Sequence, residues 1–130
     1  MIPRDAAALL RHRAPALLLG EITAFDGTTL ECSARGPGPW RWAQLLEGAA
    51  QAAGLLAGLQ AGGPDCRAVI AEVREAAITT TAHRGPLRFV ATLDRRLLGF
   101  WRCRTEVRSE DGPPLLTAWI AVAPAAHHEP

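Results

Sequence analysis

The longest apolar stretch of the chain covers residues 40–60, and Glu47 is the only charged side chain between Ala43 and Leu59. Alanine and leucine dominate this stretch, and proline and β-branched residues are absent, so it is predicted to be a helix. The Gly62–Pro64 segment ends it. The Glu and Gln residues inside the stretch and the arginines around it favour a helix buried in a core over a membrane span.

Alternation of apolar and polar residues predicts strands on both sides of this helix. A hairpin precedes it, with strands at 16–25 and 28–34 joined by a turn at Asp26-Gly27. Residues 67–78 are ambiguous, because valine and isoleucine favour a strand while Glu, Arg and Ala permit a helix; we predict a strand. The remaining predicted strands are 87–93, 99–107 and 115–122. One helical turn is predicted at 5–10, and an irregular Gly- and Pro-rich loop at 35–40.

This order of elements predicts an α+β fold in which an antiparallel sheet covers a long helix. A helix that is apolar on every side needs cover on every side. One curved sheet supplies most of that cover, and a partner subunit is a source for the rest. The length of 130 residues fits a single domain. We place this domain at residues 1–124 and a flexible tail at 125–130.

Charge and composition exclude several classes of function. The net charge is +1 and all 14 basic residues are arginine, so the sequence predicts no nucleic-acid partner and offers no lysine for Schiff-base chemistry. No convincing signal peptide precedes the domain, and we expect a cytoplasmic protein without a membrane partner. The chain has no phosphate-binding or dinucleotide motif and no metal-ligand spacing, so no cofactor and no metal are predicted. An odd number of widely spaced cysteines favours reduced, packed thiols: Cys32, Cys66 and Cys103.

Helical periodicity places Glu47 on a face made of small residues and one glutamine. The other members of this face are Ala43, Ala50, Gln51, Gly54 and Gly58. Small side chains let another backbone approach closely or leave room for a ligand. Two interpretations of Glu47 remain open. Its carboxylate stabilises the first turns of the helix through the helix dipole, or it is held in an apolar pocket and acts as a general acid.

Several segments resemble one known family in the same order. "LLRHRAPALLLGEITAFDGTTLECSA" and "LLEGAAQAAGLLA" resemble the opening and the central helix of the 3-hydroxyacyl-acyl-carrier-protein dehydratases. "HRGPLRFVATLDRR", "FWRCRTEV" and "PLLTAWIAV" resemble strands of that family. The similarity covers roughly residues 8–123. Within the family, the chain looks most like the dehydratase-like proteins of aryl polyene and related polyketide clusters.

The resemblance implies a hot-dog fold, in which a long central helix is wrapped by a curved antiparallel sheet and two subunits form a dimer with joined sheets. It also implies an acyl tunnel at the dimer interface. In this family a His of one subunit removes the α-proton of a 3-hydroxyacyl thioester, and a helix Asp or Glu of the other protonates the departing hydroxyl. The implied partners are an acyl carrier protein or coenzyme A thioester and a second subunit, either identical or a related dehydratase. The implied context is fatty-acid, polyketide or aryl polyene biosynthesis.

By this resemblance, Glu47 matches the catalytic acid, but the catalytic His is missing. An ungapped count puts Ser33 at its position. Trp40 and Trp42 replace the small residues at the start of the helix. They are expected either to contact the substrate, together with Gln51 and Gly54, or to pack in the core. The four histidines are not predicted to replace the base: His12 belongs to a structural element, His83 to a surface turn, and His127 and His128 to the tail.

Three hypotheses for the function follow. The first is an active dehydratase with Glu47 as acid and an unidentified base. The second is a dehydratase-like protein without independent catalysis, which holds acyl chains or completes the site of a homologue. The third is a hot-dog thioesterase, in which a helix carboxylate activates water and no His is needed. Carrier proteins are acidic, so arginines near the tunnel are docking candidates, unless they are ordinary solvated side chains: Arg35, Arg41, Arg84 and Arg88.

Overall fold

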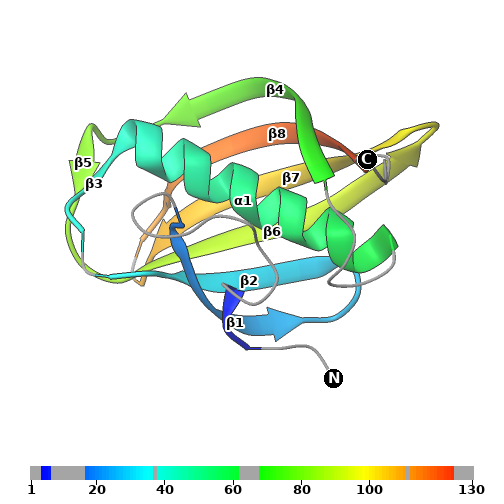
Figure 1. Cartoon of the computed structure of the whole chain (residues 1–130). Helices are drawn as coiled ribbons and strands as arrows, with labels where there is room; N and C mark the ends of the chain where they lie inside the picture. Colours follow the sequence, from blue (N-terminus) through cyan, green and yellow to red (C-terminus); the bar gives the residue numbers. More distant parts are fainter. Residues whose placement is uncertain (1–3, 7–16, 37, 62–67, 111, 125–130) are drawn as a thin grey trace, which may run out of the picture.

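A single long helix packs against one curved antiparallel sheet, as the sequence predicts (Figure 1). The computed structural model describes residues 4–6, 17–36, 38–61, 68–110 and 112–124. The six-stranded sheet has the order β1-β2-β6-β7-β8-β4. Its elements are β1 (Leu19–Phe25), β2 (Thr29–Ala34), α1 (Trp42–Ala61), β4 (Ala68–Ile78), β6 (Leu87–Leu97), β7 (Phe100–Ser109) and β8 (Pro114–Pro124). A separate two-stranded ladder joins β3 (Trp40–Arg41) to β5 (Ala82–His83).

The strand prediction for residues 67–78 is confirmed by β4, whereas the predicted start of the helix is wrong by two residues. Trp40 and Arg41 form β3 because they pair with His83 and Ala82, about forty residues away in the chain. A two-residue ladder of this kind has no local sequence pattern, so only the folded chain reveals it. Most of the predicted helical turn at 5–10 and the predicted tail at 125–130 lie outside the described residues.

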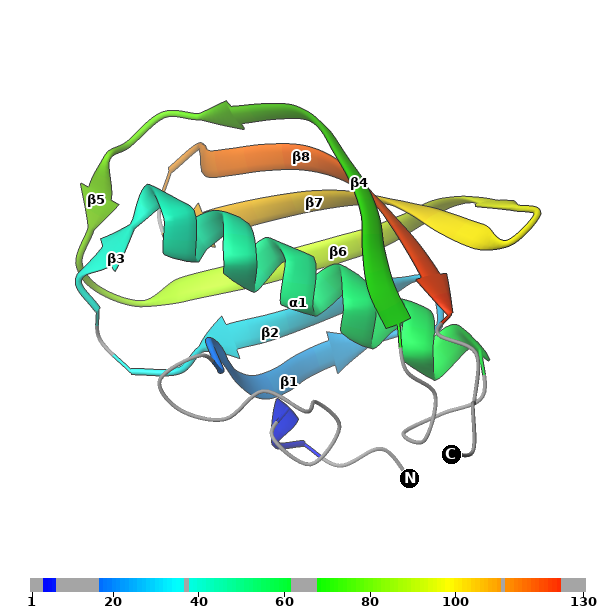
Figure 2. The same ribbon diagram turned by 45° about the horizontal axis from the view of Figure 1, so that its top comes forward.

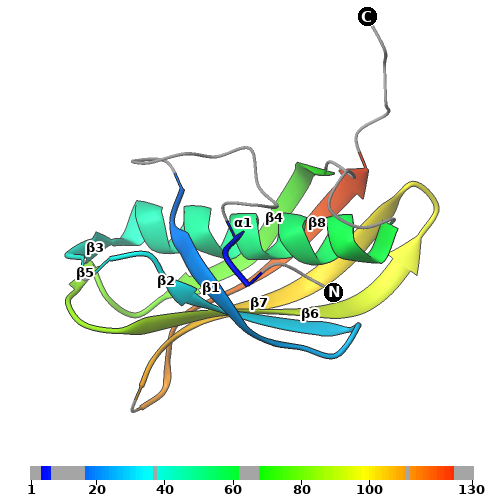
Figure 3. The same ribbon diagram turned by 60° about the horizontal axis from the view of Figure 1, so that its bottom comes forward.

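The core lies between α1 and the inner face of the sheet (Figure 3). Along β7, burial alternates residue by residue, and the buried set is Trp101, Cys103, Thr105 and Val107. α1 approaches β6 closely at Gly48. A Cβ atom placed at Gly48 would lie 2.4 Å from a ring carbon of Phe89, which is fully buried. A glycine at this position therefore lets the helix lie directly on the aromatic ring.

A side-chain hydrogen-bond cluster holds the turn between β1 and β2. The Asp26 carboxylate accepts hydrogen bonds from the backbone N–H groups of Thr28, at 2.9 Å, and Thr29, at 2.8 Å. Gly27 has φ 99°, a conformation that glycine adopts without strain. The hydrogen bonds from Thr28 and Thr29 hold the pKa of Asp26 below its ordinary value. The predicted hairpin at Asp26-Gly27 is confirmed. The Asp26 hydrogen bonds and the positive φ of Gly27 explain why the chain turns at these two residues.

β4 forms one edge of the sheet (Figure 2). It keeps apolar side chains exposed. Ile70 lies opposite Val122 in the β4–β8 ladder, and Val73 lies opposite Ile120. The two β8 residues are fully buried on the inner face of the sheet, so their β4 partners point to that same face. Yet Ile70 and Val73 are 42% and 41% exposed. The inner face of the sheet therefore continues past the cover that α1 provides.

Within the described residues, no helix combines the length and the apolar character that crossing a bilayer requires.

Candidate functional site

The start of α1 is fixed by contacts with two other parts of the chain. The backbone N–H of Trp42 donates to the carbonyl oxygen of Thr81 at 3.2 Å. The side-chain oxygen of Gln44 accepts a hydrogen bond from the backbone N–H of Arg41 at 2.9 Å. These bonds anchor the first turn of the helix beside the segment between β4 and β5. The side chains of Glu47 and Gln51 lie on the turns that follow.

Glu47 and Gln51 lie one helical turn apart and are hydrogen-bonded, as the periodicity predicts. The Gln51 Nε2 atom donates to Glu47 Oε1 at 3.4 Å. Gln51 is buried, and its Oε1 atom accepts a hydrogen bond from the backbone N–H of Leu18 at 3.0 Å. The glutamine therefore links the Glu47 carboxylate to the segment that leads into β1.

Glu47 itself is exposed in the single chain. This differs from the apolar pocket that one interpretation of the sequence expected around it. The physical reason is that the sheet covers the opposite side of α1, the side that carries Leu45 and Ala49. Within the described residues, the sheet therefore supplies no apolar wall on the Glu47 side of α1.

The helix face around Glu47 is open beside Gly54. Ala43 is exposed, Ala50 and Gly54 are half-buried, and Gly58 is buried. A Cβ atom placed at Gly54 would have no neighbour within 4 Å. The small-residue face predicted from the sequence is therefore present, and it leaves space next to the carboxylate.

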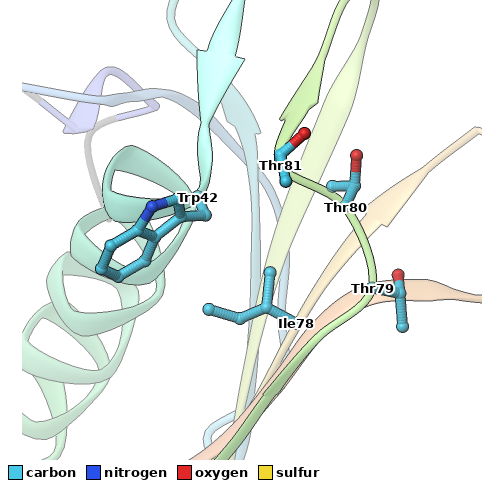
Figure 4. A pocket seen from close by; sticks show the side chains of 5 residues that line it. All are labelled: Trp42, Ile78, Thr79, Thr80 and Thr81. Carbon is cyan, nitrogen blue, oxygen red and sulfur yellow. The ribbon is translucent and has the colours of Figure 1, made fainter.

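The two tryptophans at the start of the helix have different environments. Trp40 is buried, and its indole N–H has no hydrogen-bond partner in the described part of the molecule. Trp42 is 51% exposed and lines an open pocket of about 340 Å³ (Figure 4). The other lining residues are Ile78, Thr79, Thr80 and Thr81. Trp40 thus packs as a core residue, while Trp42 faces a space that a ligand could enter.

The sequence analysis missed the threonines of this pocket. Thr79 Oγ1 donates to the carbonyl oxygen of Leu115 at 3.2 Å, and Thr80 Oγ1 donates to that of Ala82 at 2.7 Å. These bonds hold the segment between β4 and β5 next to Trp42. The three consecutive threonines after a predicted strand are conspicuous in the sequence. No local sequence pattern, however, predicts that they lie next to the start of the long helix.

Ser33 and His83 lie on strands outside α1. Ser33 lies in β2, where its Oγ atom accepts a hydrogen bond from the backbone N–H of Glu21 at 2.9 Å. His83 is half-buried in β5 and lies opposite Trp40 in the short ladder, so its predicted position in a surface turn is wrong. Its neighbours place it at the same end of the molecule as the start of α1. His12, His127 and His128 lie outside the described residues.

The two cysteines that the structure describes are not placed as nucleophiles. Cys32 and Cys103 are fully buried, and burial raises the pKa of each thiol to about 12. Both therefore remain protonated at neutral pH. Cys66 lies outside the described residues. In the part of the chain that the structure covers, no three His, Cys, Asp or Glu side chains come together to hold a metal ion.

The predicted docking arginines differ in their surroundings. The Arg35 guanidinium pairs with Asp5 and donates from Nε to the carbonyl oxygen of Leu19 at 2.8 Å. Arg88 lies 3.7 Å from a Glu31 carboxylate oxygen. Arg41, in the β3–β5 ladder, and Arg84, directly after it, are exposed near the start of α1. These last two are the ones closest in sequence to the Trp42 pocket.

Comparison with known proteins identifies the fold. No protein-family model matches the sequence, and a search of curated proteins gives no match. Among solved structures, the dehydratase heterocomplex ApeI:P from Xenorhabdus doucetiae matches with a TM-score of 0.77 and 18% identity, over 95% of this chain and 92% of that chain. A thioesterase from Haemophilus influenzae matches with a TM-score of 0.68 and 15% identity, over 84% and 82% of the two chains. The chain has the hot-dog fold.

The hot-dog neighbours carry more than one activity in their names. A mutant thioesterase from Pseudomonas aeruginosa also matches, with a TM-score of 0.65 and 18% identity over 81% of each chain. The hot-dog fold therefore accommodates dehydratases and thioesterases alike. The fold alone does not distinguish these two activities, so the function has to be argued from the residues around α1.

Proposed function

We propose that this chain is a dehydratase-like hot-dog subunit that acts on 3-hydroxyacyl thioesters, with Glu47 as the acid and a second subunit completing the site. One observation supports this most directly. A single carboxylate, linked to the buried Gln51, lies on an open face of small residues that its own sheet does not cover. The match to a dehydratase heterocomplex over nearly the whole chain is consistent with this proposal.

The uncovered β4 edge supports a dimer. Ile70 and Val73 point to the inner face of the sheet but remain exposed. A second subunit that pairs along β4 would continue the sheet and cover these side chains. A partner that also covered the open face of α1 would bring apolar surface next to Glu47. The carboxylate would then be dry enough to retain the proton that it donates.

The proposed reaction is the loss of water from a 3-hydroxyacyl thioester. A base removes the proton from the α-carbon, Glu47 protonates the hydroxyl group on the β-carbon, and water leaves to give a trans-2-enoyl thioester. The acyl chain would run along the face beside Gly54, and the pocket at Trp42 would receive the part of the substrate nearer its carrier. That carrier is an acyl carrier protein or coenzyme A. We place this reaction in the cytoplasm, in fatty-acid, polyketide or aryl polyene biosynthesis.

The base is the missing part of this proposal. The described part of the chain contains one histidine, His83, which lies beside the start of α1. A related dehydratase subunit that carries its own histidine would supply the base in a heterodimer. Loss of a general base costs about 10²–10⁴-fold in rate, so the chain alone is expected to be slow or inactive.

A thioesterase is the second candidate, and one observation favours it. Glu47 is exposed, so water has access to the carboxylate in the single chain. A carboxylate that orients water at a thioester carbonyl needs such access and needs no histidine. Two of the similar hot-dog structures are thioesterases.

One assay separates these functions. The purified protein is incubated with a 3-hydroxyacyl thioester, alone and together with a hot-dog dehydratase that keeps its catalytic histidine but has its own helix carboxylate replaced by an amide, and enoyl product and free thiol are both measured. Glu47→Gln removes the carboxylate and keeps its shape. Glu106→Gln is the matched control, because Glu106 lies on the outer face of β7, away from α1.

We expect enoyl product in the mixed sample, reduced about 10²–10⁴-fold by Glu47→Gln and unchanged by Glu106→Gln. Release of free thiol by the wild type but not by Glu47→Gln would show that the protein hydrolyses the thioester, and would favour the thioesterase over the dehydratase. Equal enoyl formation by the wild type and Glu47→Gln would exclude Glu47 as the acid.

A further inference from the structure

The hairpin between β6 and β7 projects beyond the rest of the sheet. The pairing of β6 with β2 ends at Thr92, and the pairing of β7 with β8 begins at Trp101. Residues 94–100, here called the hairpin arm, therefore pair only across the β6–β7 hairpin, with each other and with Trp101 and Arg102. Figure 1 shows the arm as the yellow hairpin that extends past the end of α1.

The end of the arm is apolar and uncovered. Leu98 is 100% exposed, Leu97 is 39% exposed and Phe100 is 36% exposed. Leu97 and Phe100 lie opposite each other, and Leu98 and Gly99 form the turn between them. Gly99 has φ 84°, so glycine supplies the tight turn that presents Leu98. Large apolar side chains that follow one another at a projecting tip mark an interaction surface.

Positive charge flanks this apolar tip. Arg95 and Arg96 precede it and are both exposed. The carboxylate of the arm, Asp94, is paired with Arg102 at 2.7 Å, so the two arginines set the sign of the charge next to the tip. The Arg96 guanidinium lies over the Trp101 ring, 5.4 Å from its centroid. This contact keeps the arginine at the base of the arm.

We propose that the hairpin arm docks the protein on anionic membrane surfaces, with Leu98 and its apolar neighbours inserted among the lipids and Arg95 and Arg96 at the phosphate groups. A bilayer fits this surface because a convex tip needs no shape-matched groove to bury its side chains in a fluid interface. The arginines add attraction to anionic headgroups. The sequence alone predicts no membrane partner, because nothing local shows that Leu97 and Leu98 lie at the tip of a projecting hairpin.

Vesicle co-sedimentation tests the proposal. The full chain is mixed with phosphatidylcholine vesicles, with and without phosphatidylglycerol, and the bound fraction is measured against lipid concentration. Added inorganic phosphate at constant ionic strength tests whether the arginines bind the phosphate group alone. Leu98→Ser removes the apolar tip. Arg95→Gln with Arg96→Gln removes the charge, and Arg84→Gln is the control that removes an exposed charge at the other end of the molecule.

We expect binding to the anionic vesicles that phosphate does not displace. The affinity should fall about tenfold for Leu98→Ser, from the loss of one buried leucine. It should fall about fivefold for each arginine removed from the arm, and by much less for Arg84→Gln. Because Leu98 is fully exposed, Leu98→Ser should leave the thermal unfolding midpoint unchanged, which shows that the variant is folded.

Three results would overturn the proposal. The first is no binding of the wild type to anionic vesicles. The second is equal binding of the wild type and Leu98→Ser. In the third, Leu98→Ser lowers the molecular mass in solution instead of the vesicle affinity, which would mean that a second copy of the chain covers the arm.

Discussion

At the scale of single residues, two glycines of α1 have opposite surroundings. A Cβ atom at Gly48 would collide with the Phe89 ring, whereas one at Gly54 would meet nothing. The glycine at position 48 is therefore needed for packing in the single chain. The glycine at position 54 is not needed for packing against the described residues. Its small size leaves room for a ligand or a partner subunit on that face of α1.

The matched pair Gly48→Ala and Gly54→Ala tests this difference. Gly48→Ala should lower the free energy of unfolding by about 1–3 kcal/mol, because the ring and the helix have to move apart. Gly54→Ala should raise it by about 0.5–1 kcal/mol, since alanine is the better helix former. Urea unfolding of both variants measures the two values. Similar effects of the two substitutions would contradict the described packing.

A second prediction concerns the buried thiols. Cys66→Ser leaves Cys32 and Cys103 as the only thiols, and burial raises the pKa of both to about 12. The folded variant should therefore react with Ellman's reagent hardly at all at neutral pH, and with both thiols once it is unfolded in guanidinium. Rapid reaction of the folded variant would show that β2 or β7 opens readily.

Part of the candidate site could be predicted from residues alone. Glu47 and Gln51 are four positions apart, and helical geometry is enough to bring them together. The exposure of Glu47 could not be predicted, because it depends on which side of α1 the sheet covers. The partners of Trp42 could not be predicted either, since the threonines come from a segment almost forty residues further along the chain.

At the scale of elements, the turn between β1 and β2 depends on the charge of one side chain. Asp26 accepts hydrogen bonds from two backbone N–H groups, and these lower its pKa in the folded protein. A pKa that is lower in the folded than in the unfolded state means that the charged carboxylate stabilises the fold. This stabilisation is fully present when the pH is above 3.8, the pKa of an ordinary Asp. This stabilisation is lost as the pH falls through the lowered pKa.

Asp26→Asn keeps a hydrogen-bond acceptor and removes the charge. At neutral pH the variant should unfold at a lower urea concentration than the wild type. The gap between the two urea midpoints should narrow as the pH is lowered below about 4. Urea unfolding at several pH values measures this, and a gap that stays constant with pH would contradict the assigned role of the charge.

The elements themselves were largely predictable, because their patterns are local. The alternation in β7 and the turn at Asp26-Gly27 were sufficient to place strands within a few residues. The β3–β5 ladder was missed because it depends on the meeting of two distant segments. The hairpin arm was missed for a related reason: the predicted strands stopped at 93 and began again at 99, and only the register against β2 and β8 shows that β6 and β7 continue and project.

At the scale of the whole molecule, one chain leaves its fold incomplete. Among the described residues, Ile70 and Val73 are exposed on the inner face of β4, and Glu47 is exposed on α1. The proposed dimer along β4 would cover Ile70 and Val73. A charge placed on this edge should therefore prevent association without unfolding the chain, because position 73 is already 41% exposed.

Val73→Glu tests this dimer. The wild type should have the mass of a dimer by light scattering, and the variant the mass of a single chain, with any activity that depends on Glu47 lost. Thr23→Glu on the opposite edge strand, β1, is the control and should leave the mass unchanged. A wild type that is monomeric at all concentrations and in the presence of related subunits would contradict the proposed dimer.

The hydrogen bond between the Leu18 amide and the Gln51 side chain has a practical consequence for handling this protein. Trimming the chain through Leu18 would remove the donor that orients the glutamine, and the carboxylate one helical turn away would lose its alignment. Shortened versions that are folded by spectroscopic criteria would then show a lower activity than the full chain. An affinity tag is best attached after the last residue, with every amino-terminal residue retained.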